Sequence, residues 1–498
     1  MRIPAQGIGR DLLFRSLESY RRDDVHWRSG RLLSYIYDAG EEVEEVVKRA
    51  YMMYLSENCI DPVAFPSVLR LENELVAMLA AHMSGDHDVV GNFTSGGTES
   101  IILAVKAARD WARVHKPEIS APEIIVPVTA HAAFHKAASY LDVKLVPTAI
   151  VPGTYKADVA SVERAITPNT ILLVGSAVSY AHSVIDPIAA LGRLAQQHRV
   201  LLHIDGCIGG FLLPYFRRLG QALPDFDFSV PGVTSISIDL HKYAFAAKGA
   251  SVILYRNKEI RKYQVHTCSH WTGYALTSMT MQNSRSAGPL AAAWAVLRYI
   301  GDDGYLHIAK QLLEGTKRVI RGIERIPALR LLGQTEMNMV SFTSEQVSLF
   351  ELIDAMKERG WYLQPQLAFE GSEESIHLSI GPNNCRHLDA LLGDLEHCAS
   401  ALQEGPVNKS AVEPTEAAAV LERGRSQKLE AKRKLYVILN EMTPPQRERF
   451  LTDLMNDIYC QPSHAEATEA AETAEAAEAA EAAGPQDRIG LTDPLSAG

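Results

Sequence analysis

Cysteine is scarce in this sequence, with six residues in 498, and no two of them form a CxxC pair. This spacing argues against a zinc ribbon and against a thioredoxin-like redox motif. A chain of this length has enough apolar surface to fold without a disulfide scaffold. Scattered single thiols are typical of a reducing compartment, so the sequence predicts a cytoplasmic protein.

Long apolar runs are also missing. The first residues, MRIPAQGIGRDLL, lack the apolar core of a signal peptide. No stretch reaches the ~18 apolar residues that a membrane-spanning helix requires. We therefore expect neither a signal peptide nor a transmembrane helix.

An excess of basic charge is absent as well. The net charge is −11, and residues 461–498 contribute −7 of it through eight acidic residues and one Arg. The rest of the chain is close to neutral for its size. Because no basic surface is available to attract the phosphates of DNA or RNA, we do not expect nucleic-acid binding.

Short β-branched runs alternate with helix-length segments in the middle of the chain. This alternation is typical of a parallel sheet with helices on both faces, whose strands are buried on both sides and nearly continuously apolar. Helices are expected over 41–54, 68–83 and 188–198. The predicted strands are 123–128, 143–148, 170–175, 199–205, 234–239 and 251–256.

The pattern changes twice toward the C-terminus. A long helix over 290–320, strands in LRLLG, MVSFTS and IHLSIG, and a helix over 348–359 predict a smaller α+β domain. Charged helices are expected within 423–459, around Pro444 and Pro445. Residues 464–483 are almost all Ala and Glu, which is typical of a solvated, disordered tail, with a partner-binding helix as the alternative. The predicted parts are an N-terminal helical segment (1–66), a large domain (67–289), a small α+β domain (290–404), a linker with charged helices (405–460) and the tail (461–498).

Three short motifs carry candidate chemistry, and each has an ordinary alternative when taken alone. The sequence TSGGTES over 94–100 opens a predicted helix, where backbone N–H groups bind phosphate, but it also suits a glycine-rich turn. Asp205 ends an apolar strand, at the edge where open α/β sheets bind ligands, but it could equally cap a helix. Lys242 follows His241 after another strand and can form a Schiff base with a carbonyl cofactor, or lie on the surface.

Together the three motifs match the needs of one cofactor. Pyridoxal phosphate requires a phosphate cradle, an acid against its ring nitrogen and a lysine for its aldehyde. Gly97 and Thr98, Asp205, and Lys242 supply these parts, and His131 adds a ring that could stack on the cofactor. The sequence therefore predicts a pyridoxal-phosphate enzyme.

A metal site is the rival interpretation of His131 and His135, which stand four residues apart. The pair lacks the glutamate of an HExxH motif, because position 132 is Ala. We therefore predict no metal.

Five ordered motifs also resemble the sphingosine-1-phosphate lyase branch of the pyridoxal-phosphate-dependent group II decarboxylase family. The likeness extends from about residue 28 to about residue 400. It rests on TSGGTES (94–100), AHAAFHKAASY (130–140), GSAVSYAHSVIDPI (175–188), HIDGCIGGFLLP (203–214) and SISIDLHKYAFAAKGAS (235–251).

The resemblance implies an aspartate-aminotransferase-like fold, with a large parallel-dominated sheet domain and a small C-terminal α+β domain, and a homodimer with active sites at the subunit interface. It also implies roles for single residues. Lys242 would be the Schiff-base lysine, Asp205 the partner of the ring nitrogen and His131 the stacking ring. The cofactor phosphate would be held by Gly97, Thr98 and His241, with Ser284 of QNSRSAG reaching the neighbouring subunit's cofactor, and the substrate would be contacted by Tyr37, Asn58, Tyr180 and Lys248.

One position departs from the family pattern. Asp61 stands where these lyases have a histidine near the substrate phosphate. A carboxylate there would repel a phosphate dianion, unless Asp61 only caps the turn before Pro62. The cofactor prediction is unaffected, whereas the choice of a phosphorylated substrate depends on this residue.

Three functions follow from these observations. The favoured one is an aldehyde-lyase that breaks a Cα–Cβ bond by retro-aldol cleavage of an amine substrate. An amino-acid decarboxylase or another pyridoxal-phosphate reaction, such as transamination, is the alternative, because the cofactor motifs serve them equally. A non-catalytic, cofactor-binding scaffold whose tail recruits partners is the third.

Overall fold

The computed structural model describes residue 3, residues 5–404 and residues 430–459. It divides into two compact units, of which Trp27–Ala411 contains both large sheets and the candidate site. The expected linker after 405 and the Ala/Glu tail over 464–483 lie outside the described residues. The five cysteines among the described residues are all free thiols.

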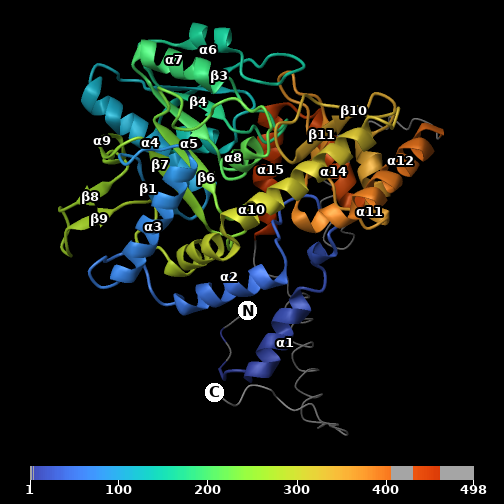
Figure 1. The fold of residues 1–498 in the computed structure, drawn as a ribbon, viewed down its shortest axis with the longest axis horizontal. Helices are drawn as coiled ribbons and strands as arrows, with labels where there is room; N and C mark the ends of the chain where they lie inside the picture. Colours follow the sequence, from blue (N-terminus) through green and yellow to red (C-terminus); the bar gives the residue numbers. More distant parts are fainter. Residues whose placement is uncertain (1–2, 4, 405–429, 460–498) are drawn as a thin grey trace. The chain divides into compact units, whose positions relative to one another are not determined.

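A seven-stranded sheet forms the centre of this unit (Figure 1). Its order is β1-β7-β6-β5-β4-β2-β3, and β7 alone runs antiparallel to its neighbours. The strands are β1 (Val90–Thr94), β2 (Glu123–Pro127), β3 (Lys144–Thr148), β4 (Thr170–Ser176), β5 (Leu201–Asp205), β6 (Ser235–Asp239) and β7 (Ser251–Tyr255).

Each face of this sheet has its own apolar core. Along β2, Ile124 and Val126 pack with helices α4 and α5, whereas Ile125 points to the opposite core, which contains α3 and α7. Alternation across a strand produces this division. The helices of this part are α2 (Glu41–Met53), α3 (Pro66–His82), α4 (Gly97–His115), α5 (Ala133–Leu141), α6 (Val159–Ala165), α7 (Ile188–His198), α8 (Leu213–Arg218) and α9 (Lys258–Arg261), after the 3-10 turn η1 (Trp27–Ser29).

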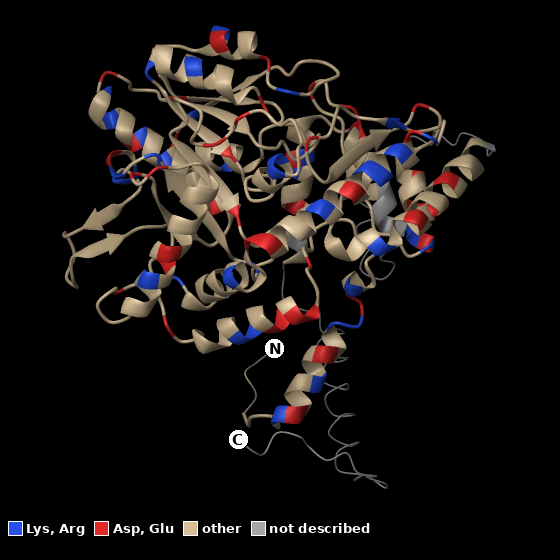
Figure 2. Cartoon of the chain, in the orientation of Figure 1, with Lys and Arg blue, Asp and Glu red and all other residues tan. Residues whose placement is uncertain are grey.

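The charged residues of helix α2 are unevenly distributed along its length. Four glutamates occupy its first half, whereas Lys48 and Arg49 lie just past its middle and its last turn carries no basic residue (Figure 2). The acidic groups of the first turn interact favourably with the helix dipole.

A second, antiparallel sheet of order β10-β11-β13-β12 forms the smaller α+β part. Helix α10 (Ala287–Ile323) contacts helices of the large sheet and strands of the small one. It changes direction at Gly301, whose φ of 66° suits glycine. The other elements are β10 (Arg330–Leu331), β11 (Met339–Thr343), α11 (Leu349–Glu358), β12 (Gln364–Gln366), β13 (Ser375–Ser379), η2 (Pro382–His387), α12 (Leu388–Glu404) and the hairpin β8 (His266–Cys268) and β9 (Leu276–Ser278).

The predicted fold class is confirmed, because a largely parallel sheet is covered on both faces and followed by a small α+β part. All six strands predicted in the large sheet are present. The sequence did not indicate β1, β8, β9 or β12. The domain boundaries stay predictions.

The second unit contains α1 (Arg10–Tyr20), α14 (Glu430–Glu441) and α15 (Pro444–Ile458). The predicted charged helices around Pro444 are therefore present. Thr443 caps α15, since its backbone N–H and hydroxyl donate to Gln446 Oε1 at 3.0 and 2.8 Å. None of the described helices has both the length and the apolar character needed to cross a membrane.

Candidate active site

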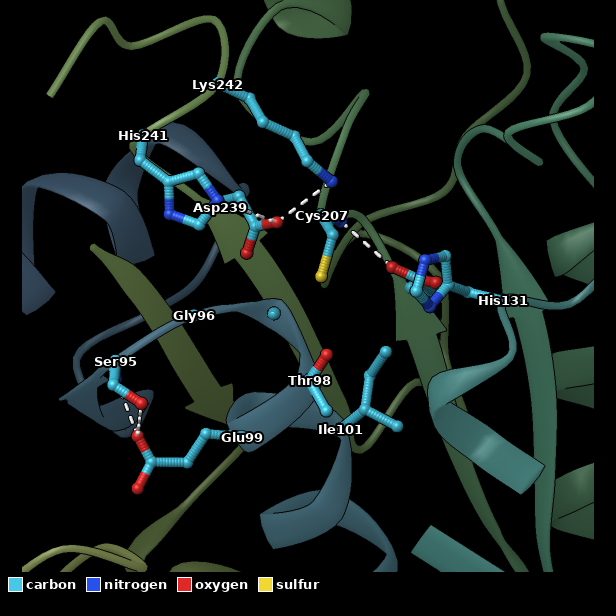
Figure 3. A pocket seen from close by; sticks show the side chains of 12 residues that line it. Ser95, Gly96, Thr98, Glu99, Ile101, His131, Cys207, Asp239, His241 and Lys242 are labelled. Carbon is cyan, nitrogen blue, oxygen red and sulfur yellow. Dashed lines mark hydrogen bonds and ion pairs between the residues drawn. The ribbon is translucent and has the colours of Figure 1, made fainter. Parts of the chain in front are cut away.

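A cavity of about 350 Å³ opens where β5 and β6 end and α4 begins (Figure 3). Six residues predicted from the sequence lie around it: Gly97, Thr98, His131, Asp205, His241 and Lys242. The other lining residues are Ser95, Gly96, Glu99, Ile101, Cys207 and Asp239. Parallel strands bring their carboxyl ends to one edge, which explains why motifs far apart in the sequence meet there.

Gly97 is the first residue of α4, so the backbone N–H groups of the helix start line the cavity. A Cβ atom on Gly97 would lie 2.7 Å from Asp239 Oδ1 and from Cys207 Sγ. No larger residue fits without displacing these groups. The glycine therefore lets Asp239 and Cys207 pack against the start of α4, whose backbone N–H groups are the candidate contacts for an anion.

Asp205 is buried at the end of β5, and its Oδ1 accepts the backbone N–H of Cys207 at 3.0 Å. Cys207 follows it into the cavity lining, where burial raises the pKa of the thiol. Asp205 therefore presents a carboxylate to the cavity beside a neutral thiol.

Lys242 forms an ion pair within its own motif. Its Nζ lies 2.9 Å from Asp239 Oδ2, and His241 Nε2 lies 3.7 Å from the same oxygen. Burial opposes the charge of Lys242, but Asp239 outweighs burial and raises the pKa of the lysine. Burial lowers the pKa of His241, with Asp239 acting in the opposite direction.

His131 lies exposed beside the cavity, and its Nδ1 accepts the backbone N–H of Ala133 at 3.1 Å. Its ring is therefore accessible to a planar ligand. The described residues contain no group of three or more His, Cys, Asp or Glu side chains suited to a metal ion.

Tyr37 and Lys248 lie near Lys242. Lys248 Nζ is 4.9 Å from the centre of the Tyr37 ring and donates to the Tyr35 carbonyl at 2.9 Å. Burial lowers the pKa of Lys248 to about 8, and the charge of Lys242 adds to this effect. Burial raises the pKa of Tyr37, which keeps the phenol protonated.

Tyr180 approaches from the loop after β4, and its hydroxyl donates to Gln364 Oε1 of β12 at 2.7 Å. Its ring stacks on His377 of β13, with centroids 4.4 Å apart. Tyr180 therefore connects the large sheet to the small one. Its phenol interacts electrostatically with Tyr37 and Lys242.

Tyr37, Tyr180 and Lys248 lie near the cavity but are not among the residues that line it, and neither are the three other predicted residues, Asn58, Asp61 and Ser284. The last three belong to residues 57–61 and 283–287, called the paired segments below. Asn58 and Ser286 form an antiparallel bridge, in which Cys59 N–H donates to the carbonyl of Arg285 at 3.0 Å.

Within the paired segments, Asp61 caps its own turn. Its Oδ1 accepts the backbone N–H groups of Val63 and Ala64 at 2.8 and 3.4 Å. Asp61 and Ser284 are both exposed. In the described structure Lys248 is held by backbone carbonyls, not by Asp61.

Sequence reasoning gave no role to Asp239, although it belongs to the same motif as Lys242. It also missed Glu99, which joins the cavity to Met281, two residues before the paired segment 283–287. Glu99 Oε2 accepts the backbone N–H and hydroxyl of Ser95 at 2.6 and 2.7 Å, and its Oε1 accepts the N–H of Met281 at 2.8 Å. The spacing of Asp239 from Lys242 was a visible signal, whereas the contact of Glu99 with Met281 was not.

A buried ion pair anchors the paired segments to the core. Arg285 contacts Glu72 of α3 at 3.0 Å and donates to the carbonyl of Phe93 in β1 at 2.6 Å. Glu72 also accepts the N–H of Phe93 at 2.9 Å. Ser284 is therefore presented at the surface next to a fixed residue.

The cavity fits pyridoxal phosphate on its own chemistry. It combines a glycine-lined helix start for a phosphate, the Asp205 carboxylate for a basic ring nitrogen and the Lys242 amine for an aldehyde. Asp239 Oδ1 is buried without a hydrogen-bond partner, as expected in a pocket whose polar ligand completes it.

Comparison with known families agrees with this geometry. Residues 24–345 match the model described as the pyridoxal-dependent decarboxylase conserved domain. The chain belongs to this family. Pyridoxal phosphate is therefore the cofactor, and the enzyme is a pyridoxal-phosphate-dependent lyase, as the sequence predicted.

Among curated members of the family, a sphingosine-1-phosphate lyase of Arabidopsis thaliana is 39% identical over 414 residues, which cover 81% of this chain and 74% of the relative. A sphingosine-1-phosphate lyase of Rattus norvegicus is 36% identical over 82% of this chain and 71% of the relative. A probable L-aspartate decarboxylase of Pyrococcus furiosus is 34% identical over 72% of this chain and 94% of the relative.

The fold is shared with a solved sphingosine-1-phosphate lyase of Burkholderia pseudomallei. The TM-score is 0.79 at 33% identity, covering 86% of this chain and 97% of that one. A glutamate decarboxylase of Lactobacillus brevis has the same fold, with a TM-score of 0.72 at 19% identity.

Proposed function

We propose that this enzyme is an aldehyde-lyase that cleaves the Cα–Cβ bond of phosphorylated long-chain 2-amino alcohols. The observation that carries the proposal is the position of Tyr37 and Lys248 beside Lys242. Both residues occupy the positions that contact substrate in the sphingosine-1-phosphate lyase pattern. Relatives of that name, 36% and 39% identical over most of the chain, support the same reaction.

Different cavity residues would bind different groups of the cofactor. Gly97, Thr98 and His241 would hold its phosphate, Lys242 its aldehyde and Asp205 its ring nitrogen. When bound, pyridoxal phosphate supplies an electron sink for the bond that breaks at the amine-bearing carbon. The exposed ring of His131 would cover one face of the cofactor.

Lys248 is the proposed proton acceptor. Breaking a bond between the amine-bearing carbon and a hydroxyl-bearing carbon releases an aldehyde, so the hydroxyl proton must be removed. A pKa of about 8 leaves a useful fraction of Lys248 neutral near physiological pH. The protonated phenol of Tyr37, whose pKa is raised, donates a hydrogen bond to the same substrate oxygen.

We also propose a homodimer with shared sites and a cytoplasmic location. Ser284 is exposed beside a buried anchor, which suits a residue that completes the partner's phosphate site. Size-exclusion chromatography with light scattering tests the dimer, and cell fractionation tests the location.

A carboxy-lyase is the second candidate, supported by the similarity to the probable L-aspartate decarboxylase. The deciding experiment incubates the purified, cofactor-loaded chain with a phosphorylated long-chain base and, separately, with L-aspartate and L-glutamate. Aldehyde release from the base supports the proposal. CO₂ release from an amino acid without aldehyde release would replace it, and a visible cofactor band with neither activity would fit the non-catalytic, cofactor-binding scaffold.

A further inference from the structure

Asp239 is the buried carboxylate at the centre of the cavity. It ends β6, and its side chain is 4% exposed. One oxygen contacts Lys242 and approaches His241, while both oxygens lie against Gly97 (Figure 3). No other acidic side chain makes an ion pair with Lys242 within the described residues.

The other groups that face Lys242 leave Asp239 as its main counter-charge. Cys207 after β5 and Tyr37 before α2 are near it, and burial raises the pKa of both, so both are neutral at physiological pH. Lys248 and His241 are either positively charged or neutral, so neither can serve as a counter-charge to Lys242. Asp205 and Tyr180 lie on the neighbouring strand end and loop.

Asp239 is itself held in the charged state. Burial opposes its charge, but Lys242 and His241 together lower the pKa of the carboxyl below its usual value. The pair is therefore an ammonium and a carboxylate in contact, in a site with little water to screen them.

We propose that Asp239 is a positioning residue that holds the nitrogen of Lys242 in place and keeps it positively charged, both as the free amine and when a cofactor aldehyde is bonded to it. Charge is conserved when that bond forms. The ammonium gives two protons to the aldehyde oxygen, which leaves as water, and the nitrogen keeps the third proton while it forms a double bond to carbon. Asp239 then still faces a cation.

The same contact serves the lysine when a substrate amine displaces it. If the substrate arrives as an ammonium, two of its protons pass to the nitrogen of Lys242, which leaves as an ammonium, and the carboxylate at 2.9 Å would hold it in place. Lys242 must give up one proton before it can attack again, but a nitrogen held in this way needs no search through rotamers.

The test uses the full chain with bound pyridoxal phosphate. The visible absorption band of the cofactor–lysine linkage depends on whether the nitrogen is protonated, so its pH midpoint reports the charge directly. In Asp239→Asn we expect this midpoint to fall by at least one pH unit, and in Asp239→Glu to return toward wild type. Asp110→Asn is the matched control, since Asp110 pairs with Lys106 at 3.0 Å on α4 and does not line the cavity.

A second measurement needs no variant. Acylation of Lys242 in the cofactor-free wild-type chain, followed by mass spectrometry over a range of pH, should reach half its maximum above roughly pH 10.4, the ordinary lysine value. An unchanged spectral midpoint in Asp239→Asn, or half-maximal acylation near neutral pH, would overturn the proposal.

Discussion

The cavity around Lys242 and the paired segments around Ser284 are built in opposite ways. In the cavity, buried strand ends supply charged groups that contact each other at short range, such as Asp239 and Lys242 at 2.9 Å. In the paired segments the buried ion pair of Glu72 and Arg285 serves only as an anchor, and the candidate functional groups Asp61 and Ser284 are exposed. A single chain therefore brings the chemical groups of the cavity together, whereas the paired segments present Asp61 and Ser284 at the surface.

The largest effect is expected from removing the lysine of the cavity. Lys242→Ala should abolish turnover and the visible cofactor band, because no other amine lies in this position to bond the aldehyde. The fold should be retained but the melting temperature should fall, because removal of Lys242 leaves the buried carboxylate of Asp239 without its counter-charge. Turnover with a normal spectrum in the variant would contradict the assignment.

Asp205→Asn should lower kcat about 100-fold or more, because loss of an aligned charge in a buried site costs roughly 3–4 kcal/mol at the transition state. Cofactor retention should change much less, which would distinguish an effect of the Asp205 charge on catalysis from an effect on cofactor binding. Steady-state kinetics and the fraction of bound cofactor measure the two. A kcat within about threefold of wild type would mean that Asp205 faces another group.

The protonation state of Lys248 should determine how the activity depends on pH. A base must be neutral to accept a proton, so kcat/KM should rise with pH until it levels off above about 8, the pKa that burial and Lys242 impose. Lys248→Met should lower kcat about 100-fold and remove this rise. Lys258→Met, at an exposed lysine of α9, is the matched control. The same rise in Lys248→Met would assign it to another group.

The paired segments can be tested by complementation between chains. Ser284→Glu should weaken cofactor retention by placing a negative charge near a phosphate of the partner. If sites are shared, mixing inactive Lys242→Ala and Ser284→Glu chains should restore about one quarter of wild-type activity, because half of the dimers are hybrids with one intact site each. No recovery from chains shown to exchange would restrict each site to one chain.

The smallest effect is expected at Asp61. Asp61→Asn keeps a side chain that caps turns but removes the charge, so kcat/KM for a phosphorylated base should rise about twofold to fourfold at low salt. Asp61→His should add to the gain as pH falls through roughly 6.5. Both gains should fade with salt, since exposed charges are screened over about 8–10 Å. A rise in kcat/KM that is independent of salt concentration would show that Asp61 acts by capping its turn and not through its charge.

The difference between the cavity and the paired segments also explains which site residues the sequence could predict. Asp205 and Lys242 follow apolar strands, so their meeting at one sheet edge could be expected from the strand pattern. The three-residue spacing of Asp239 and Lys242 was visible in the sequence, but the close approach of Gly97, at the start of α4, to Asp239 was not.

The elements that sequence reasoning missed have weak local signals. Strand β1 contains Gly91 and Asn92, both poor strand formers, and is held by pairing with β7. Strands β8 and β9 are only three residues each, and β8 is largely exposed. The contact of Glu99 with Met281 joins the first turn of α4 to a residue 182 positions later, and no periodicity in the sequence indicates it.

The pairing of β1 with β7 also bears on when the site can form during synthesis. Thr94, three residues before Gly97, pairs with Ser251, so the helix start that would hold the cofactor phosphate is fixed by a strand made more than 150 residues later. A nascent chain that has not yet released β7 from the ribosome leaves β1 without a strand partner. Cofactor capture therefore belongs to the last stage of folding of the large sheet, and chains truncated before β7 should be unable to retain it.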